Sequence, residues 1–394
     1  MATIWKSEDN RSDGLTGNRC PANPQPAVHS LLPVALAAVY FAIALASIEW
    51  TRDEARIAAI WLPNALVFGL LLRFDHLRTG PTLAWLVTAS VGANLAAGDD
   101  ALTALVLAMA NGLETALALW LTIRWCGRNP ELESLPQLGR MLLASSVIAP
   151  AAGALFAVFS LGGDTAAELA GQLATWFLAD GLGMTLMAPS VMIVVDALRQ
   201  SPGQSIADDL KAWILIGVIG LAVTLLVFCQ SSYPLLFLCA PVILLFAYRL
   251  GMLATALSTL SIAVIATAAT AMDSGPIALM DGSLTSRLIV LQVFLVGIFA
   301  TGLPVAAALA HKRRLLSELE DRERQLALLA NNVTDAVLRF DLDGVCVDAS
   351  PSVREVLARP QEDFIGRPAT SAVHPEAAEA IAATSERLRS GRRE

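Results

Sequence analysis

Charged residues are scarce in this sequence. They make up 16% of its 394 residues, whereas 55% of the residues are hydrophobic. This apolar excess is larger than an ordinary soluble domain carries, so much of the chain has to face lipid. The formal net charge of -8, together with the lack of a strip in which Arg or Lys alternates with aromatic residues, argues against nucleic acid as a partner.

Cysteine and histidine are also few. The five cysteines form no C-x-x-C pair and none lies near a histidine at metal-ligand spacing, so we expect free thiols. The four histidines fall in tails, in loops and near the C-terminus. The sequence has no G-x-x-x-x-G-K-[ST] phosphate loop, no H-E-x-x-H zinc pair and no serine nucleophile elbow. We therefore expect no catalytic centre, no metal site and no evident cofactor in these residues.

The N-terminal segment lacks the marks of a signal peptide. Its first 27 residues are polar and contain three prolines, without a short apolar core or a cleavage site of small residues. We predict a disordered cytoplasmic leader over 1–30.

Long apolar stretches fill the region 31–310. A helix needs roughly 20 apolar residues to cross the hydrocarbon core of a bilayer, and ten stretches come close to this length. The sequence therefore predicts an all-α, polytopic membrane domain with about ten transmembrane helices. The expected spans are 31–48, 57–72, 81–97, 101–125, 138–161, 169–195, 212–229, 233–247, 252–271 and 286–310.

The distribution of Lys and Arg predicts the orientation of these spans. Cations near short loops remain on the cytoplasmic side, and with the N-terminus inside, eleven cations fall in cytoplasmic connections and three in outer loops. We expect a bacterial inner-membrane protein with both termini in the cytoplasm. The segment 233–247 is short and contains two prolines, so it either crosses as a tilted or broken element or is lost together with a neighbouring span.

Two carboxylic acids lie in the middle of expected spans, Glu114 and Asp180. A charged group at the bilayer centre costs about 2.5 to 3.5 kcal/mol, so each needs a physical reason to be there. One interpretation is a polar cavity that binds a ligand, a cation or a proton, with Asn64, Asn94 and Asn111 as further members. The other is that protonated or hydrogen-bonded acids hold the helices together. The sequence leaves both open.

Proline and glycine mark further special positions within the spans. Pro63 either kinks the second span and opens its backbone or forms a bend near the interface. Gly92, Gly181 and Gly183 allow close approach of helices.

A charged helical segment follows the last span. Residues 311–333 are predicted to form a signalling linker, and its seven-residue spacing indicates either a parallel dimeric helix or a single amphipathic helix. The residues at these positions are Leu315, Leu319, Arg322, Leu326, Leu329 and Val333.

Residues 334–394 change pattern again. Strands are predicted over 336–340 and 345–347, joined by a hairpin turn at 341–344. Helices are predicted over 351–358 and 377–388. Two strands cannot close a sheet core, so we expect a truncated α+β domain.

Several short motifs resemble a known bacterial family, the membrane-associated sensor domain of type one (MASE type one). They are Trp61-Leu62-Pro63-Asn64, Gly92-Ala93-Asn94, Asn111-Gly112-Leu113-Glu114, Asp180-Gly181-Leu182-Gly183 and Tyr248-Arg249-Leu250-Gly251. The segment from Asp341 to Gly344, Ile365-Gly366-Arg367 and His374-Pro375-Glu376 resemble the first part of a PAS domain. The resemblance implies that a diguanylate cyclase, a phosphodiesterase or a histidine kinase follows in the intact protein.

Three functions are compatible with these features. The leading hypothesis is an inner-membrane receptor for a small ligand or a membrane partner protein, which relays a signal through the linker helix of a homodimer. The second is a transporter or channel that uses Glu114 and Asp180 as coupling sites. The third is an anchor that only localises its output domain. The PAS-like region and the lack of an inverted repeat favour the receptor.

Overall fold

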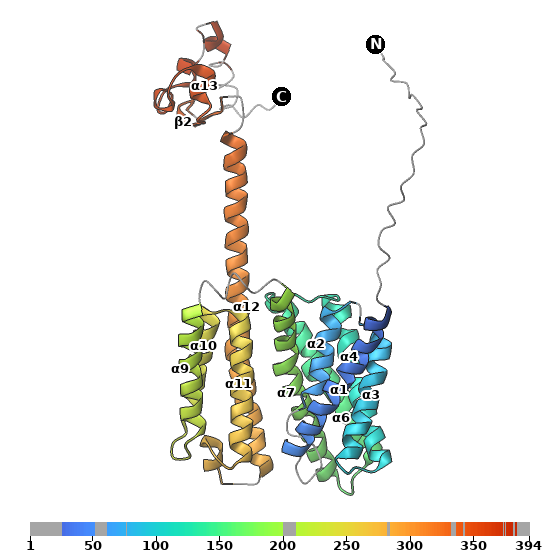
Figure 1. Ribbon diagram of the computed structural model, residues 1–394. Coiled ribbons are helices and arrows are strands. Elements are labelled where there is room, and N and C mark those ends of the chain that lie inside the picture. Colours follow the sequence, from blue (N-terminus) through green and yellow to red (C-terminus); the bar gives the residue numbers. More distant parts are fainter. Residues whose placement is uncertain are drawn as a thin grey trace, which may run out of the picture. The chain divides into compact units, whose positions relative to one another are not determined.

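The computed structural model describes residues 26–51, 61–75, 77–199, 210–281, 284–331 and 336–380 apart from 342, 373 and 375, together with residue 383. The chain divides into two compact units, Met1–Leu309 and Ala310–Glu394. The first unit contains only helices among its described residues, as the long apolar stretches predict (Figure 1).

Helices cover nearly every expected span. The helices of the first half are α1 (Pro26–Thr51), α2 (Pro63–Arg73), α3 (Thr79–Ala96), α4 (Ala101–Cys126), α5 (Leu135–Leu142), the π-helical turn η1 (Leu143–Ile148), α6 (Ala149–Leu161) and α7 (Ala166–Arg199). Those of the second half are α9 (Leu210–Phe228), η2 (Leu235–Leu238), α10 (Cys239–Arg249), α11 (Met252–Ala271), η3 (Pro276–Leu279) and α12 (Leu284–Asn331). The prediction of a polytopic all-α membrane domain is confirmed.

Seven helical segments of the described residues are long and apolar enough to cross a membrane on their own. α2 and α10 are apolar but have 11 residues each, too few to span the hydrocarbon core alone. The segment that was expected to be short or broken, 233–247, consists of the 3-10 turn η2 followed by α10. The structure agrees with a broken element, and the crossing of the membrane by this segment stays a prediction.

The second span begins later than the sequence indicated. Its helix was expected over 57–72, but α2 starts at Pro63, and Trp61 and Leu62 are not helical. Pro63 therefore neither kinks a continuous helix nor bends it; proline suits the first turn of a helix because its missing N–H is not needed there. Residues 52–60 lie outside the described residues.

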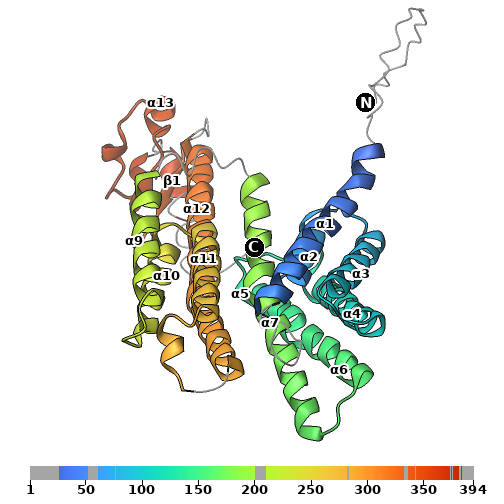
Figure 2. The same cartoon turned by 60° about the horizontal axis from the view of Figure 1, so that its bottom comes forward.

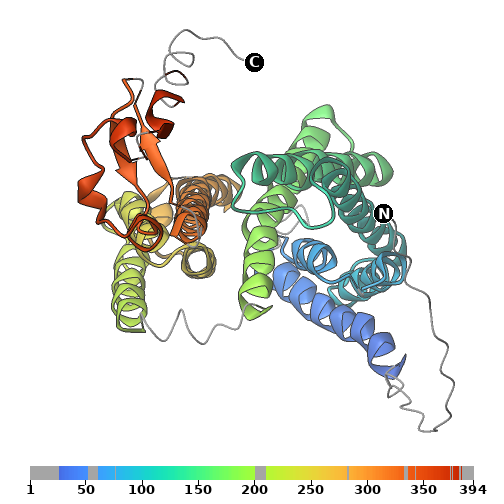
Figure 3. The same cartoon turned by 90° about the horizontal axis from the view of Figure 1, so that it is seen from above.

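α2 is short but central. Nine of its 11 residues are buried, and it packs against α7, α4 and α1 (Figure 3). α3 lies between α1 and α4, while α6 packs against α4 and α7 (Figure 2). One core of buried apolar side chains extends from Tyr40 and Phe68 to Leu295 on α12. In contrast, α9 keeps many large apolar side chains exposed, which fits contact with lipid.

The second unit contains the hairpin that the sequence predicts. Strands β1 (Leu338–Phe340) and β2 (Cys346–Ala349) pair antiparallel, with Leu338 opposite Ala349. The turn is closed by the Asp341 carboxylate, which accepts hydrogen bonds from the backbone N–H groups of Asp343 (2.9 Å) and Val345 (2.8 Å).

Short helical elements follow the hairpin of the second unit. They are α13 (Val353–Leu357), η4 (Gln361–Asp363) and η5 (Ala369–Ala372). Val353 and Phe364 pack on Cys346 and Ala349 of β2 in a small core. The helix predicted over 377–388 is present at 376–380, and most of its remainder lies outside the described residues.

Candidate functional site

The late start of α2 places its first turn in the middle of the bundle. The Trp61 backbone N–H donates a hydrogen bond to the Ala179 carbonyl of α7 (3.2 Å), which holds the residues before α2 against that helix. No side chain caps the first turn of α2. Asn64, its second residue, is buried with 1% of its surface exposed.

Asn64 lies in a hydrogen-bond network that joins four helices. The Tyr40 hydroxyl on α1 donates to its Oδ1 atom at 2.9 Å. The Asn64 Nδ2 atom donates to Asn111 Oδ1 (3.1 Å) and to Glu114 Oε2 (3.4 Å) on α4. Asn111 in turn donates through Nδ2 to Ser90 Oγ on α3 at 3.1 Å. These hydrogen bonds satisfy polar groups that are expensive to bury without a partner.

Asp180 completes this group from α7. The carboxyl groups of Glu114 and Asp180 lie within hydrogen-bonding reach of each other, and Asp180 lies beside the Trp176 indole. Glu114 is fully buried and Asp180 is 4% exposed. We call the set of six buried side chains from α1, α2, α3, α4 and α7 the polar cluster; its members are Tyr40, Asn64, Ser90, Asn111, Glu114 and Asp180.

Several atoms at the polar cluster have no hydrogen-bond partner of good geometry among the described residues. The carboxyl atoms Glu114 Oε1 and Asp180 Oδ2 are two of them, and the indole N–H groups of Trp61 and Trp176 are two more. The hydroxyl of Ser146 on η1, whose backbone packs on Gly181, also has no such partner. In the described part of the chain, the cluster therefore leaves both acceptors and donors free for a small guest.

The backbone closes tightly around the cluster. A Cβ atom built on Gly183 would lie 1.8 Å from the Trp61 carbonyl oxygen, and one built on Gly181 would lie 2.7 Å from the carbonyl oxygen of Ser146. Gly153 of α6 faces the Glu114 side chain, since a Cβ there would lie 3.3 Å from Glu114 Cβ. The prediction that Gly181 and Gly183 permit close approach is confirmed.

The structure brings together most of the residues proposed from the sequence. Asn64, Asn111, Glu114 and Asp180 meet in the polar cluster. Asn94 is also buried, but its Nδ2 atom donates to the Ser90 carbonyl of its own helix at 2.8 Å. It therefore supports Ser90 rather than contacting the carboxyl groups through a hydrogen bond.

Sequence reasoning missed the contributions of Tyr40, Ser90 and Trp176. Tyr40 is one of only three tyrosines and lies mid-span in α1, which is a usable signal. Ser90 precedes Asn94 by one helical turn and so shares its face. Nothing in the sequence distinguishes Trp176 from the other tryptophans that a membrane protein carries near its interfaces.

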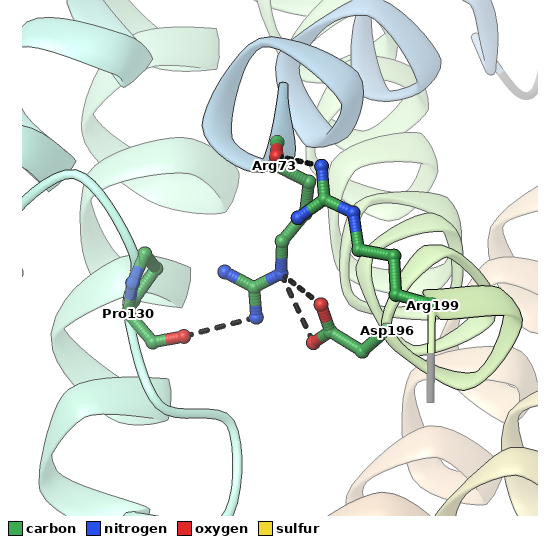
Figure 4. A network of polar contacts seen from close by, with 4 residues as sticks. All are labelled: Arg73, Pro130, Asp196 and Arg199. Carbon is green, nitrogen blue, oxygen red and sulfur yellow. Dashed lines mark hydrogen bonds and ion pairs between the residues drawn. The ribbon is translucent and has the colours of Figure 1, made fainter. Parts of the chain in front are cut away.

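A second polar network lies at the C-terminal ends of α2 and α7 (Figure 4). The Arg73 guanidinium is paired with Asp196, with Nε 2.9 Å from Oδ1, and its Nη2 atom donates to the Pro130 carbonyl at 3.1 Å. Arg199 donates to the Arg73 carbonyl oxygen, and its guanidinium lies 4.6 Å from the centre of the Phe74 ring. These contacts place the ends of α2 and α7 and the loop after α4 at one end of the bundle.

Family comparisons agree with the resemblance noted from the motifs. Residues 30–314 match the family MASE1, and residues 330–394 match the PAS fold. The chain belongs to the MASE1 family. No curated protein and no solved structure matches it. This chain is therefore a multi-pass membrane sensor domain of the MASE1 type followed by a PAS region.

Three of the five motifs that carry the MASE1 resemblance converge in space. The Trp61 motif supplies Asn64, the Asn111 motif supplies Glu114, and the motif that begins at Asp180 supplies the other acid and the two glycines at the tight contacts. Motifs scattered over more than a hundred residues of the MASE1 domain thus form one site.

The residues proposed for signal relay lie on α12. Leu315 and Leu319 are exposed, at 47% and 55%, and Arg322 is exposed as well. Leu326 and Leu329 belong to the same helix, but their side chains, like the whole of Val333, lie outside the described residues.

Proposed function

We propose that this MASE1 chain is the input half of an inner-membrane signalling protein, in which a change at the polar cluster is passed through α12 to the PAS region. The observation that carries the proposal is the extent of α12, which runs over 48 residues from Leu284 to Asn331. The last membrane span and the charged linker are therefore one helix, which would be about 70 Å long at 1.5 Å per residue.

A continuous helix can transmit a small displacement because hydrogen bonds join its successive turns, and α12 continues through Pro304, which removes one of these bonds. The relay requires two arrangements of the bundle, and a signal can shift their populations only by binding one better than the other. The polar cluster is suited to this because it links α1, α2, α3, α4 and α7, and α7 packs against α11.

We further propose that two copies of the chain pair through the linker part of α12. Leu315 and Leu319 expose large apolar side chains in the part of α12 that is rich in charged residues, 311–324. The ion pair between Arg314 and Glu318 is four residues apart and stays on the surface of one helix, so it does not occupy the leucine seam. Burying that seam against a second copy removes apolar area from water.

The orientation and the output domain also belong to the proposal. We place the end of the bundle with Arg73 and Arg199 in the cytoplasm, because cations are retained on that side. The outer side then holds Asp273, which follows α11, and its ion-pair partner Arg287 in the first turn of α12. The output, a diguanylate cyclase, a phosphodiesterase or a histidine kinase, is supported only by the resemblance to sensors of this type.

Hydrogen exchange in nanodiscs tests the coupling without knowledge of the output. Asp180→Asn is expected to change the exchange rate of amides in the linker 311–331 and in β1 and β2 at least severalfold relative to the wild type. Asp100→Asn is the matched control, because Asp100 is an exposed acid outside the cluster, and should leave these rates unchanged. Equal linker exchange in the wild type and in Asp180→Asn would contradict the relay.

A transporter is the second candidate, favoured by the buried carboxyl groups of Glu114 and Asp180. Proteoliposomes that contain a pH-sensitive dye separate the two functions. A sensor should give a proton flux no faster than that of empty liposomes, with or without a membrane potential. Robust flux that disappears in Asp180→Asn would establish the transporter instead.

A further inference from the structure

No other charged side chain that the structure describes on the surrounding helices lies close to Glu114 and Asp180. α3, η1, α6 and α11 contain no charged residue. On α1, α2, α4 and α7 every other charged residue is at least nine positions along its helix from the cluster member, which is roughly 13 Å. Tyr40 is the remaining titratable group that faces the two acids.

No cation of the described residues offsets the pair. Arg73 is the only Lys, Arg or His among the buried side chains that the structure describes, and it is engaged with Asp196 and Pro130 at the end of α2. Two ionised carboxylates in apolar surroundings would leave uncompensated buried charge and would repel each other. The pair therefore needs a positively charged guest.

The available ligand atoms favour a proton over a metal ion as that guest. A calcium ion takes six to eight oxygen ligands, and even magnesium requires an octahedral set. The amide oxygens Asn64 Oδ1 and Asn111 Oδ1 already accept hydrogen bonds, from Tyr40 and from Asn64. The described residues also offer no group of three or more His, Cys, Asp or Glu side chains for a metal.

The two free acceptors match a single proton. Within the pair, Glu114 Oε1 and Asp180 Oδ2 have no hydrogen-bond partner among the described residues, and they belong to acids within hydrogen-bonding reach of each other. When one of the two acids carries the proton, its O–H donates a hydrogen bond to the carboxylate oxygen of the other, so both oxygens gain a partner. The Asn64 amide, which donates to Glu114 Oε2, and the neighbouring Trp176 indole stabilise the one negative charge that remains.

We propose that Glu114 and Asp180 share one proton in the membrane interior and that this carboxylic acid–carboxylate pair is a proton-binding site. The use of the proton as the signal rests on the function proposed above, whereas the existence of the shared proton does not. Loss of the proton would force the two negative charges apart, and this would change how α4 and α7 pack on their shared neighbours α2, η1 and α6.

Infrared spectroscopy of the purified full chain in nanodiscs at neutral pH tests the site. We expect the carbonyl stretch of one buried carboxylic acid, with a shift in D₂O. In Glu114→Gln or Asp180→Asn the new amide N–H donates to the remaining carboxylate and replaces the proton, so each single variant should lose the entire band. Asp100→Asn should retain it, and near-ultraviolet circular dichroism verifies that each variant is folded.

Two results would overturn the shared proton. Loss of half the band in each single variant indicates two independently protonated acids, and absence of the band in the wild type indicates that both acids are ionised and that a cation is bound. The proposed function is tested separately, by exchange of the linker amides at two pH values that load and empty the pair. A band that behaves as expected with unchanged linker exchange would leave the proton site standing and remove its signalling role.

Discussion

Arg73 is the one buried cationic side chain of the described residues, and its contacts use the shape of the guanidinium. Its Nε atom faces Asp196 while Nη2 reaches the Pro130 carbonyl, so one planar group joins α7 to the loop after α4. A lysine ammonium is a point charge and cannot match both directions with fixed geometry. Asp196 is 36% exposed, so part of the ionic attraction is screened by water.

Replacing this arginine tests its role in bundle stability. Arg73→Lys should lower the free energy of unfolding by about 2 kcal/mol, because a buried charged group loses a hydrogen bond. The matched control is Arg128→Lys, since Arg128 and its partner Asp75 are 50% and 74% exposed; it should change stability by less than about 0.5 kcal/mol. Unfolding in mixed micelles measures both. Equal stability of the two variants would show that Arg73 acts as an ordinary surface charge.

Gly183 provides a second test at the scale of one residue. Gly183→Ala should destabilise the fold by about 3 kcal/mol, because the added Cβ meets the Trp61 carbonyl, which belongs to backbone and cannot swing away. Gly171 lies on the same helix with no atom within 4 Å of its added Cβ. Gly171→Ala should instead raise stability by up to about 1 kcal/mol. Thermal unfolding followed by tryptophan fluorescence compares them, and a harmless Gly183→Ala would contradict the tight contact.

Among the elements, α4 begins with the best-defined cap. Asp100 accepts hydrogen bonds from the Leu102 and Thr103 backbone N–H groups at 3.0 and 3.2 Å and from the Thr103 hydroxyl at 2.6 Å. An acid at this position satisfies free N–H groups and interacts with the positive end of the helix. The hydrogen bond from the Thr103 hydroxyl and those from the backbone lower the pKa of the Asp100 carboxyl below its usual value.

This cap predicts an acid-sensitive contribution to stability. Because the folded chain prefers the ionised carboxylate, the contribution is complete above the unfolded pKa of about 4 and is lost as the pH falls through the lower folded pKa. Asp100→Asn keeps a capping oxygen but cannot titrate. Melting temperatures measured from pH 6 down to pH 2 should fall more steeply for the wild type than for Asp100→Asn. Parallel curves would rule out a titrating cap.

The elements themselves were largely predictable, and the exceptions have physical causes. The length of the apolar stretches was enough to predict the long helices. Prolines and turn residues were enough to predict the break before α10 and the β1–β2 hairpin. Hydropathy did not predict the start of α2, because Ile57 to Ile60 are as apolar as the membrane helix that follows. Pro63 did not decide the question either, because proline occurs both in the first turn of a helix and at a kink inside a longer helix. No local sequence pattern predicts the π-helical turn η1, because its backbone conformation depends on packing against α4 and α7.

For the whole molecule, the polar cluster shows where sequence reasoning stops. Burial cost alone identified Glu114 and Asp180 as special, and helical spacing joined Asn111 to Glu114. That the two acids meet each other depends on which helices are neighbours, and no periodicity within α4 or α7 encodes this. Tyr40 was missed for the same reason, because its hydroxyl is significant only when α1 lies beside the first turn of α2.

The arrangement of helix ends predicts how the whole chain is threaded through the membrane. Because Arg73 contacts Pro130 and Asp196, the loop after α4 and the end of α7 lie on one side. We expect that side, and the charged part of α12, to lie in the cytoplasm, because Lys and Arg near short loops are retained there. In a cysteine-free background, Asp164→Cys should react with a membrane-impermeant maleimide added to intact cells, whereas Arg128→Cys and Glu318→Cys should react only after the cells are opened. Denatured samples control for reactivity. Labelling of Glu318→Cys in intact cells would place the linker outside, where it could not reach a cytoplasmic output, and the relay through α12 would have to be abandoned.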